Sequence, residues 1–490
     1  MQNRNVPKFG QKERRFCSPV MVCSWLLLLM WGAFLLYCWK NGLVDQKKIN
    51  ELASEVDHVL IRTETNLRHR VGVDAANNLH NVEVAVPHED TVSAPPPMDG
   101  EIHVVFSTDC SEYQDWQTLL FFHSATVVGQ KGKITRIASG CDDTKKKSLD
   151  ELYKKLYPNY GAHYTPDFKK DAKTKKKYDF YNKPWGMKHF LEHSDPPIPP
   201  NTIIALMDPD QLFLRPLTPD IKGNPSMIFN KGIKESEKFD TIGLGHPAAQ
   251  TYGLGAPWTN DNHKKFNRGK ICGEGSPCLE VKLRFGELHY SVGPPYIAHK
   301  ADFIRIVNSW TTFVPRVYEN YPYLLAEMYA FSMAAAHENL PHLQIDNHMV
   351  SAVDAPGEGW PHVDALPEIC VPPDEEGIFY TGNPMPTVIH YCQGYRAGEF
   401  GFMKRRVPKD IFSCESPMLQ IPPTNLAESK YKIKSGKKEE IRNAREAKRH
   451  AFMICTLYSA FNSALVDYKK RMCVGNPNTN YAQTININKI

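Results

Sequence analysis

The chain has 490 residues, of which 42% are hydrophobic, 11% aromatic and 23% charged, and it contains 30 glycines and 37 prolines. This composition is typical of folded protein and excludes a wholly disordered, a collagenous or a multi-span membrane protein. A formal net charge of +5 is too small to indicate nucleic acid as a partner. The length is compatible with about three domains or with one enlarged α/β domain.

An apolar segment near the start, residues 18–39, predicts one transmembrane helix. No charged residue lies between Arg15 and Lys40, and at a rise of ~1.5 Å per residue the segment spans about 30 Å of hydrocarbon. Residues 1–17 contain five basic residues and one acidic residue, which predicts a cytosolic tail and a chain that continues outside the cytosol. A cleaved signal peptide is the alternative, but the apolar run is long for one and no small-residue cleavage pattern follows it.

Residues 40–100 are polar and end in a proline-rich stretch, which predicts a stem. Nine of the 12 cysteines lie beyond residue 40, where disulfides are permitted. Because nine is an odd number, we expect one free thiol. Cys272 and Cys278 bracket a short glycine-containing loop, which favours a local disulfide over a metal site.

The pattern changes at Glu101. The run over residues 102–108 predicts a buried strand, residues 133–139 predict a second strand, and helical spacing over residues 113–129 predicts a helix between them. This βαβ unit implies parallel pairing and an α/β sheet of the nucleotide-binding kind, in which ligands bind at the carboxyl ends of the strands.

The lysine-rich stretch 144–178 is expected to be mainly a solvated insertion, with guidance of an acidic acceptor peptide as the alternative. We expect the main domain to cover residues 101–415. Residues 416–490 then form a C-terminal helical extension and tail.

The strongest chemical signal is the triplet Asp208-Pro209-Asp210, which directly follows the buried apolar run 203–207. Residues two apart at a strand end face one way, so the two carboxylates are expected to converge. Paired carboxylates suit a hard divalent cation, Mg²⁺ or Mn²⁺, which in turn binds a diphosphate. A solvated turn is the alternative interpretation of such a triplet.

His390 ends another short predicted strand and precedes a flexible glycine-containing loop, so it is a candidate third metal ligand. Glu327 lies in a nearly all-apolar helix predicted to start around Pro322. A carboxylate there is costly unless it is paired or functional. It is therefore expected either to bind a buried partner or to point into the site.

Seven motifs occur in a fixed order: FSTDCSEYQDWQT, ITRIASG, YNKPWG, MDPDQLFLRPL, VGPPYIAHKADF, LLAEMYAFSMAAA and VIHYCQGY. In this order they resemble the hydroxyproline O-arabinosyltransferase family and the related peptidyl-serine α-galactosyltransferases of plants and green algae. The resemblance covers roughly residues 101–415. It implies a GT-A-like nucleotide-diphospho-sugar transferase with a Rossmann-like central sheet behind the membrane anchor and stem, on the Golgi membrane or, alternatively, in the endoplasmic reticulum.

The resemblance also implies roles for particular residues. The metal, Mn²⁺ or Mg²⁺, would be held by Asp208, Asp210 and His390. The UDP-sugar donor would be contacted by Ser107 and Thr108 at the end of the first strand and by Asp208 of the acidic triplet. Asn182 and Lys183, at the start of a helix between these two strands, would also contact it. Glu327 would position the acceptor hydroxyl or stabilise positive charge on the sugar, with Asp346 as the reserve candidate.

The implied activity is metal-dependent, retaining transfer of a sugar from a UDP-activated donor to a hydroxyl of secreted or cell-wall proteins. L-arabinofuranose transfer to hydroxyproline is the first choice, because three of the motifs look closer to that family. Galactose transfer to serine is the alternative. A third possibility, from a different class, is a membrane-tethered glycan- or peptide-binding protein that has lost turnover.

Overall fold

The computed structural model describes residues 100–489, except 172–174, 222–223, 225, 261–262, 372–382, 430–431, 436–437 and 442. The tail, the anchor and almost all of the stem expected at residues 1–100 lie outside this part. Among the described residues, no helix combines the length and apolar character needed to cross a membrane. The described residues all belong to one compact unit.

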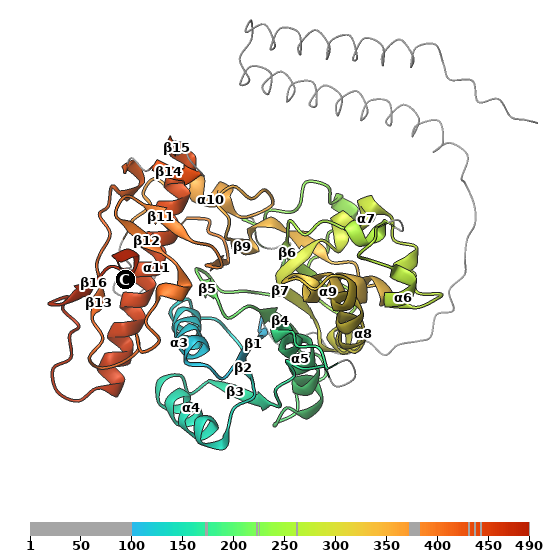
Figure 1. Ribbon diagram of the computed structural model, residues 1–490, viewed down its shortest axis with the longest axis horizontal. Helices are drawn as coiled ribbons and strands as arrows, with labels where there is room; N and C mark the ends of the chain where they lie inside the picture. Colours follow the sequence, from blue (N-terminus) through green and yellow to red (C-terminus); the bar gives the residue numbers. More distant parts are fainter. Residues whose placement is uncertain are drawn as a thin grey trace, which may run out of the picture. The chain divides into compact units, whose positions relative to one another are not determined.

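The centre of this unit is a seven-stranded mixed sheet with the order β3-β2-β1-β4-β7-β6-β8 (Figure 1). Its strands are β1 (His103–Asp109), β2 (Ile134–Ser139), β3 (Tyr160–Thr165), β4 (Ile203–Met207), β6 (Ala248–Thr251), β7 (Val292–His299) and β8 (Leu343–Ile345). Strands β1 to β4 are parallel neighbours, whereas β7 runs antiparallel to both β4 and β6. The predicted βαβ opening is confirmed, and the carboxyl ends of β1 and β4 lie at one edge.

The lysine-rich stretch is part of this sheet, so its prediction as a mainly solvated insertion is wrong for its first half. It forms helix α4 (Asp143–Leu156) and strand β3, which pairs in parallel with β2. The helix buries Leu149, Tyr153 and Leu156 and leaves most of its other side chains in solvent. The many lysines hid an amphipathic pattern because only three residues of the helix are needed to cover the sheet.

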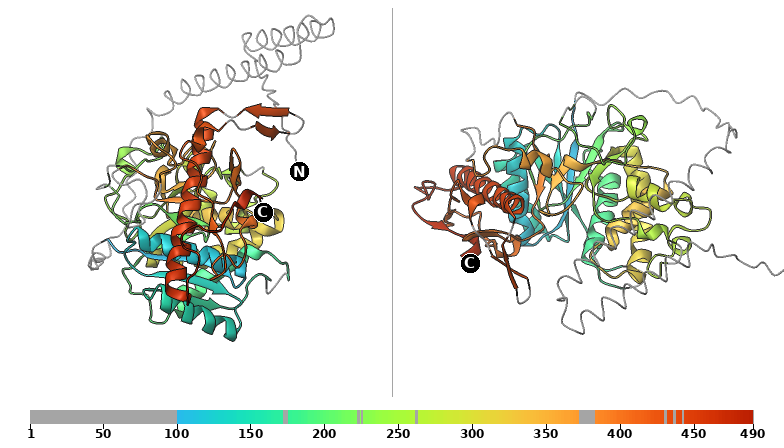
Figure 2. Two further views of the ribbon diagram at one scale, coloured as in Figure 1. Left: turned by 90° about the vertical axis from the view of Figure 1, so that its left-hand side faces the viewer. Right: turned by 90° about the horizontal axis from the view of Figure 1, so that it is seen from above.

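Helices cover both faces of the sheet (Figures 1 and 2). One face carries α5 (Asn182–His193), α8 (Lys300–Asn320) and α9 (Ala326–His337), and the other carries α3 (Glu112–Val127) and α4. Helix α9 is buried almost all round, as its sequence predicts, because it packs against α8 and strand β7. Short helices α6 (Arg268–Cys272), α7 (Leu283–His289) and α10 (Trp360–Asp364) lie in the connections.

A second sheet of three strands, with the order β5-β10-β9, follows the acidic triplet. Its strands are β5 (Gln211–Phe213), β9 (Met349–Val350) and β10 (Val388–His390). The acids directly follow β4, as expected, and a second short strand, β5, begins immediately after them. Antiparallel pairing of β10 with β5 sets His390 opposite Gln211, the residue after the triplet.

The C-terminal part is built around the 29-residue helix α11 (Ala444–Met472), which packs against α3 (Figure 2). Residues Lys438–Ile441 form strand β15, and the helix begins after the cap Asn443. Two-stranded sheets complete the region: β11 (Tyr395–Ala397) with β12 (Phe400–Phe402), β13 (Met418–Leu419) with β16 (Thr484–Ile485), and β14 (Lys432–Ser435) with β15.

Four disulfides join described cysteines, and the predicted local bridge between Cys272 and Cys278 is one of them. The others are Cys110–Cys141, Cys370–Cys455 and Cys414–Cys473. Cys392 is the free thiol that the odd count predicts.

Candidate active site

A cavity of about 350 Å³ opens at the carboxyl edge of the main sheet. Eight of the nine residues singled out in the sequence line this one cavity, namely Ser107, Thr108, Asn182, Lys183, Asp208, Asp210, Glu327 and His390. They come from five elements that are far apart in the chain: β1, α5, the β4–β5 turn, α9 and β10. The geometry therefore brings together nearly all the candidate residues that the motifs indicate.

The acidic turn between β4 and β5 is held in place by the next residue, Gln211. The Gln211 side-chain oxygen accepts a hydrogen bond from the Asp208 backbone N–H at 3.1 Å, and its amide donates to the Pro294 carbonyl at 3.1 Å. On the other side, the Tyr391 backbone N–H donates to the Asp210 carbonyl at 3.0 Å. The carboxylates therefore project from a turn that is fixed by both flanking sheets.

Asp208, Asp210 and His390 form the group that could hold a metal ion, with one ligand atom from each lying within 4.8 Å of the others. The His390 Nε2 atom is 3.2 Å from Asp210 Oδ1 and 4.0 Å from Asp208 Oδ2. Ligand atoms on one ion at about 2.1 Å are at most about 4.2 Å apart, so small side-chain rotations suffice. Two carboxylates and one imidazole fit Mn²⁺ or Mg²⁺ better than a soft metal.

Lys183 occupies the centre of the cavity wall. It lies in the first turn of α5, where the following Pro184 suits a helix start because its missing N–H would have no partner there. The Lys183 Nζ atom donates to Asp208 at 2.8 Å and to Glu327 at 3.2 Å. Burial alone would lower the pKa of Lys183, but Asp208 and Glu327 outweigh that effect and raise it, so the amine stays charged.

Glu327 satisfies both of the expectations formed for it. It binds a buried partner, Lys183, and it also lines the cavity. Its second carboxylate oxygen, Oε2, is buried and has no hydrogen-bond partner. Burial raises the pKa of Glu327, Lys183 lowers it, and the negative charge of Asp208 raises it again, with a net increase. An unpartnered acceptor atom in the cavity is available to a hydroxyl or to positive charge on a ligand.

Asp210 is more deeply enclosed than Asp208. Its two oxygens contact Lys404 Nζ at 2.5 Å and His390 Nε2 at 3.2 Å. Burial alone would raise the pKa of Asp210, but His390 and Lys404 lower it far below its usual range. At His390, burial acts to lower the pKa, whereas Cys392 and Asp210 raise it well above the ordinary value.

Lys404 is a residue that the sequence reasoning missed. It lies just after strand β12 and lines the cavity beside the acids. The available signal was its place in a run of three basic residues, Lys404-Arg405-Arg406, close behind the glycine-containing loop that follows His390. Tyr113, Lys169 and Cys392 also line the cavity without having been singled out.

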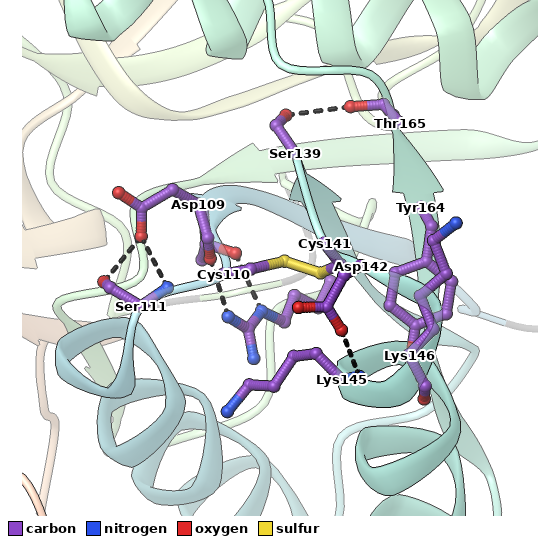
Figure 3. The surroundings of a disulfide bond; sticks show 12 residues. Asp109, Cys110, Ser111, Ser139, Cys141, Asp142, Lys145, Lys146, Tyr164 and Thr165 are labelled. Atoms are coloured by element: carbon purple, nitrogen blue, oxygen red, sulfur yellow. Dashed lines mark hydrogen bonds between the residues drawn. A yellow bond between two sulfur atoms is a disulfide. The ribbon is translucent and has the colours of Figure 1, made fainter.

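The end of β1 is braced from behind by a fully buried arginine, Arg136 on β2. Its guanidinium donates to Thr108 Oγ1, to the Asp109 carbonyl and to Asp115 Oδ1, each at 2.7 Å. Figure 3 shows the same end of the sheet, where the disulfide from Cys110 to the loop after β2 lies beside Asp109. This wall of the cavity is therefore rigidly positioned.

Asp346, the reserve candidate, is the one predicted residue that does not line the cavity. It directly follows β8, where its backbone N–H donates to the Ile228 carbonyl at 2.7 Å. Strand β8 ends at the same edge of the sheet as β4, but β7 and β6 separate the two strands. Sequence order alone could not show this separation.

Comparison with known proteins gives two curated relatives, both named peptidyl serine alpha-galactosyltransferase. The Arabidopsis thaliana protein is 35% identical over 133 residues, which are 26% of this chain and 15% of the relative. The Chlamydomonas reinhardtii protein is 24% identical over 277 residues, 53% of this chain and 33% of the relative. The chain thus matches at most about one third of either relative. No protein-family model matches it.

Solved structures that resemble the fold are also named as glycosyltransferases. The bifunctional glycosyltransferase WbbM aligns at a TM-score of 0.31 and 10% identity, covering 61% of this chain and 47% of its own. The galactosyltransferase LgtC gives 0.30 and 12%, with coverage of 60% and 87%. Mouse xyloside xylosyltransferase 1 gives 0.32 and 9%, with coverage of 59% and 97%. At these scores the likeness carries no argument about this chain. The curated relatives support the serine galactosyltransferase side of the resemblance rather than its arabinosyl side.

Proposed function

We propose that the protein is a glycosyltransferase that moves a sugar from a UDP-activated donor to a hydroxyl group of a protein. The observation that carries this proposal is the single cavity in which two converging carboxylates, an imidazole, two lysines and a buried glutamate meet at the carboxyl edge of an α/β sheet. The names of both curated relatives support the same class of reaction.

In this proposal Asp208, Asp210 and His390 hold Mn²⁺ or Mg²⁺. The bound cation would supply positive charge to the diphosphate of the donor as the bond to the sugar breaks. Lys404 and Lys183, which contact the same acids, add fixed positive charge beside it. Ser107 and Thr108 at the end of β1, and Asn182 beside Lys183, form the wall against which the nucleotide lies.

Glu327 is proposed to orient the acceptor hydroxyl or to stabilise positive charge on the sugar. Its pairing with Lys183 fits this role, because the ion pair holds the carboxylate at a fixed position in the cavity wall. Transfer with retention at the anomeric carbon does not need a strong in-line base, so we propose a retaining reaction. The chain then contributes charge stabilisation and orientation of the reactants.

Galactose transfer to serine is the first candidate for the specific reaction, since both curated relatives carry that name. Arabinofuranose transfer to hydroxyproline is the second, favoured by the motifs at residues 294–303, 326–331 and 389–395. We also propose a single-pass Golgi protein with the catalytic domain in the lumen. Four disulfides support an oxidising compartment.

The test uses the region from residue 100 onward with Mn²⁺ and either UDP-galactose or UDP-arabinofuranose. Serine and hydroxyproline peptides are offered with each donor, and the products are read by mass spectrometry. A hexose on serine supports the first candidate and a pentose on hydroxyproline the second. Failure to bind UDP in the presence of Mn²⁺ would refute glycosyl transfer and favour the binding-protein alternative.

A further inference from the structure

An exposed apolar surface adjoins the cavity next to Glu327, and we call it the lip. It consists of Phe180, Tyr323 and Leu324, whose exposures are 41%, 53% and 62%. Phe180 and Leu324 also line the cavity. Large apolar side chains that gather in the open around a functional cavity usually mark a place where another molecule binds.

Hydrogen bonds of the Tyr178 hydroxyl connect the lip to Glu327. The Tyr178 hydroxyl donates to the Leu324 carbonyl at 2.7 Å and accepts from the Glu327 backbone N–H at 3.1 Å. Its ring lies 5.4 Å from that of Phe180 and stacks on Tyr318 at 4.3 Å. One buried residue therefore holds both halves of the lip at a fixed position relative to the carboxylate.

The lysine side chains around the lip do not make it a mainly cationic surface. Lys169 pairs with Asp109 at 3.0 Å, and Lys177 lies 3.6 Å from Asp179. A further cation, that of Lys265, sits 4.7 Å from the Tyr323 ring centroid. These cations already have partners, so the lip presents mainly aromatic and aliphatic surface to a ligand.

We propose that the lip is the acceptor subsite and that it receives an extended polypeptide segment with apolar side chains on either side of the acceptor hydroxyl. This inference rests on the proposed function, since it assigns the acceptor side of the same cavity. A leucine side chain offers a sugar acceptor no hydrogen bond, whereas it packs well against side chains of a peptide. An acidic peptide would have to displace the ion pairs of Lys169 and Lys177 before it gained new ones with these two lysines.

The geometry also explains how binding would serve transfer. Leu324 lies three residues before Glu327 and lines the same cavity as Glu327 and Lys183, so a peptide that packs on the lip reaches the mouth of that cavity. Apolar contacts on both sides of the hydroxyl would then hold it in place for reaction. The lip acts as a positioning surface and does not contact the donor in this proposal.

The experiment compares three synthetic peptides that share a central serine or hydroxyproline and differ in their flanks, which are proline and valine, glutamate, or lysine. Wild-type protein with Mn²⁺ and the active donor is expected to prefer the apolar flanks by at least about tenfold in kcat/KM. In Phe180→Glu and Leu324→Glu we expect that preference to fall about tenfold through a higher KM for the peptide.

Leu244→Glu is the matched control, because Leu244 is 64% exposed and is not part of the cavity wall. It introduces the same charge at an equally exposed leucine and is expected to leave the preference unchanged. Thermal unfolding of all three variants checks that each one folds. Binding of a fluorescently labelled apolar-flanked peptide, in the presence of UDP and Mn²⁺, gives a second readout that does not depend on turnover.

Three results would overturn the inference: lip variants that match the wild type, a wild-type preference for glutamate or lysine flanks, or no binding of the apolar-flanked peptide. Each leaves the proposed function standing if the wild type binds UDP with Mn²⁺ and transfers sugar to any acceptor. Loss of UDP binding in the wild type is the separate result that refutes the proposed function itself.

Discussion

The two acids of the triplet are expected to respond differently to mutation, although both are proposed metal ligands. Asp210 is 6% exposed and is the shared partner of Lys404 and His390. Replacing Asp210 with alanine leaves the buried His390 and the partly exposed Lys404 without their carboxylate, which costs about 3 kcal/mol of stability. The side chain of Asp208 is 24% exposed, and its partner Lys183 retains Glu327, so Asp208→Ala is expected to cost about 1 kcal/mol.

Both variants lose a ligand and are expected to reduce metal-dependent transfer by about a hundredfold or more. The assay combines urea unfolding, which gives the free energy of unfolding, with transfer rates measured across a Mn²⁺ titration. Asp364→Ala is the control, because it breaks the partly buried ion pair with Arg449 far from the cavity. It should lower stability while leaving the Mn²⁺ dependence of the folded protein unchanged.

Two results would refute this reasoning. An Asp210→Ala protein as stable as the wild type would show that Lys404 and His390 do not depend on this carboxylate. A well-folded Asp208→Ala or Asp210→Ala protein with the full Mn²⁺-dependent rate would remove that residue from the proposed metal site.

Three further predictions concern Glu327, His103 and the disulfide between Cys370 and Cys455. In Glu327→Gln the amide oxygen still accepts a hydrogen bond from Lys183, but the negative charge is lost. Turnover at saturating substrates should therefore fall about a hundredfold with no loss of thermal stability. An unchanged turnover would contradict the role of Glu327. Burial and nearby positive charge lower the pKa of His103 from 6.5 to about 4. As the pH falls, the unfolded chain protonates His103 before the folded chain does, so this residue should lower the free energy of unfolding by about 3 kcal/mol between pH 6.5 and pH 4. In urea unfolding at these two pH values, His103→Gln should show a smaller loss of stability than the wild type. An equal loss in both proteins would contradict this role of His103. Cys370 and Cys455 are 85 residues apart, so removing their disulfide should lower the free energy of unfolding by about 4 kcal/mol. The measurement is urea unfolding of the variant in which both cysteines are alanine. A change below about 1 kcal/mol would argue against formation of this disulfide.

The sequence by itself determined the local elements with strong periodicity and the chemistry they carry. Strand β4 is a continuous apolar run because it is buried on both faces, and β1 and β2 bury most of their residues, so their carboxyl ends could be located without a structure. The triplet at Asp208 and Asp210 was informative because it follows such a run directly. Motif order then indicated which distant residues belong to the same site.

Tertiary structure decided what local patterns cannot encode. Lys404 enters the site only because β12 places it against Asp210, and nothing in its neighbouring sequence specifies that contact. Asp346 follows a strand at the correct edge, but the strand order of the sheet separates it from the cavity. Helix α4 was not predicted because its exposed lysines dominate the local composition. Its packing depends on a few buried apolar residues, which contribute most of the burial free energy. Pairing partners and strand order depend on contacts between remote residues, and therefore only the folded chain fixes them.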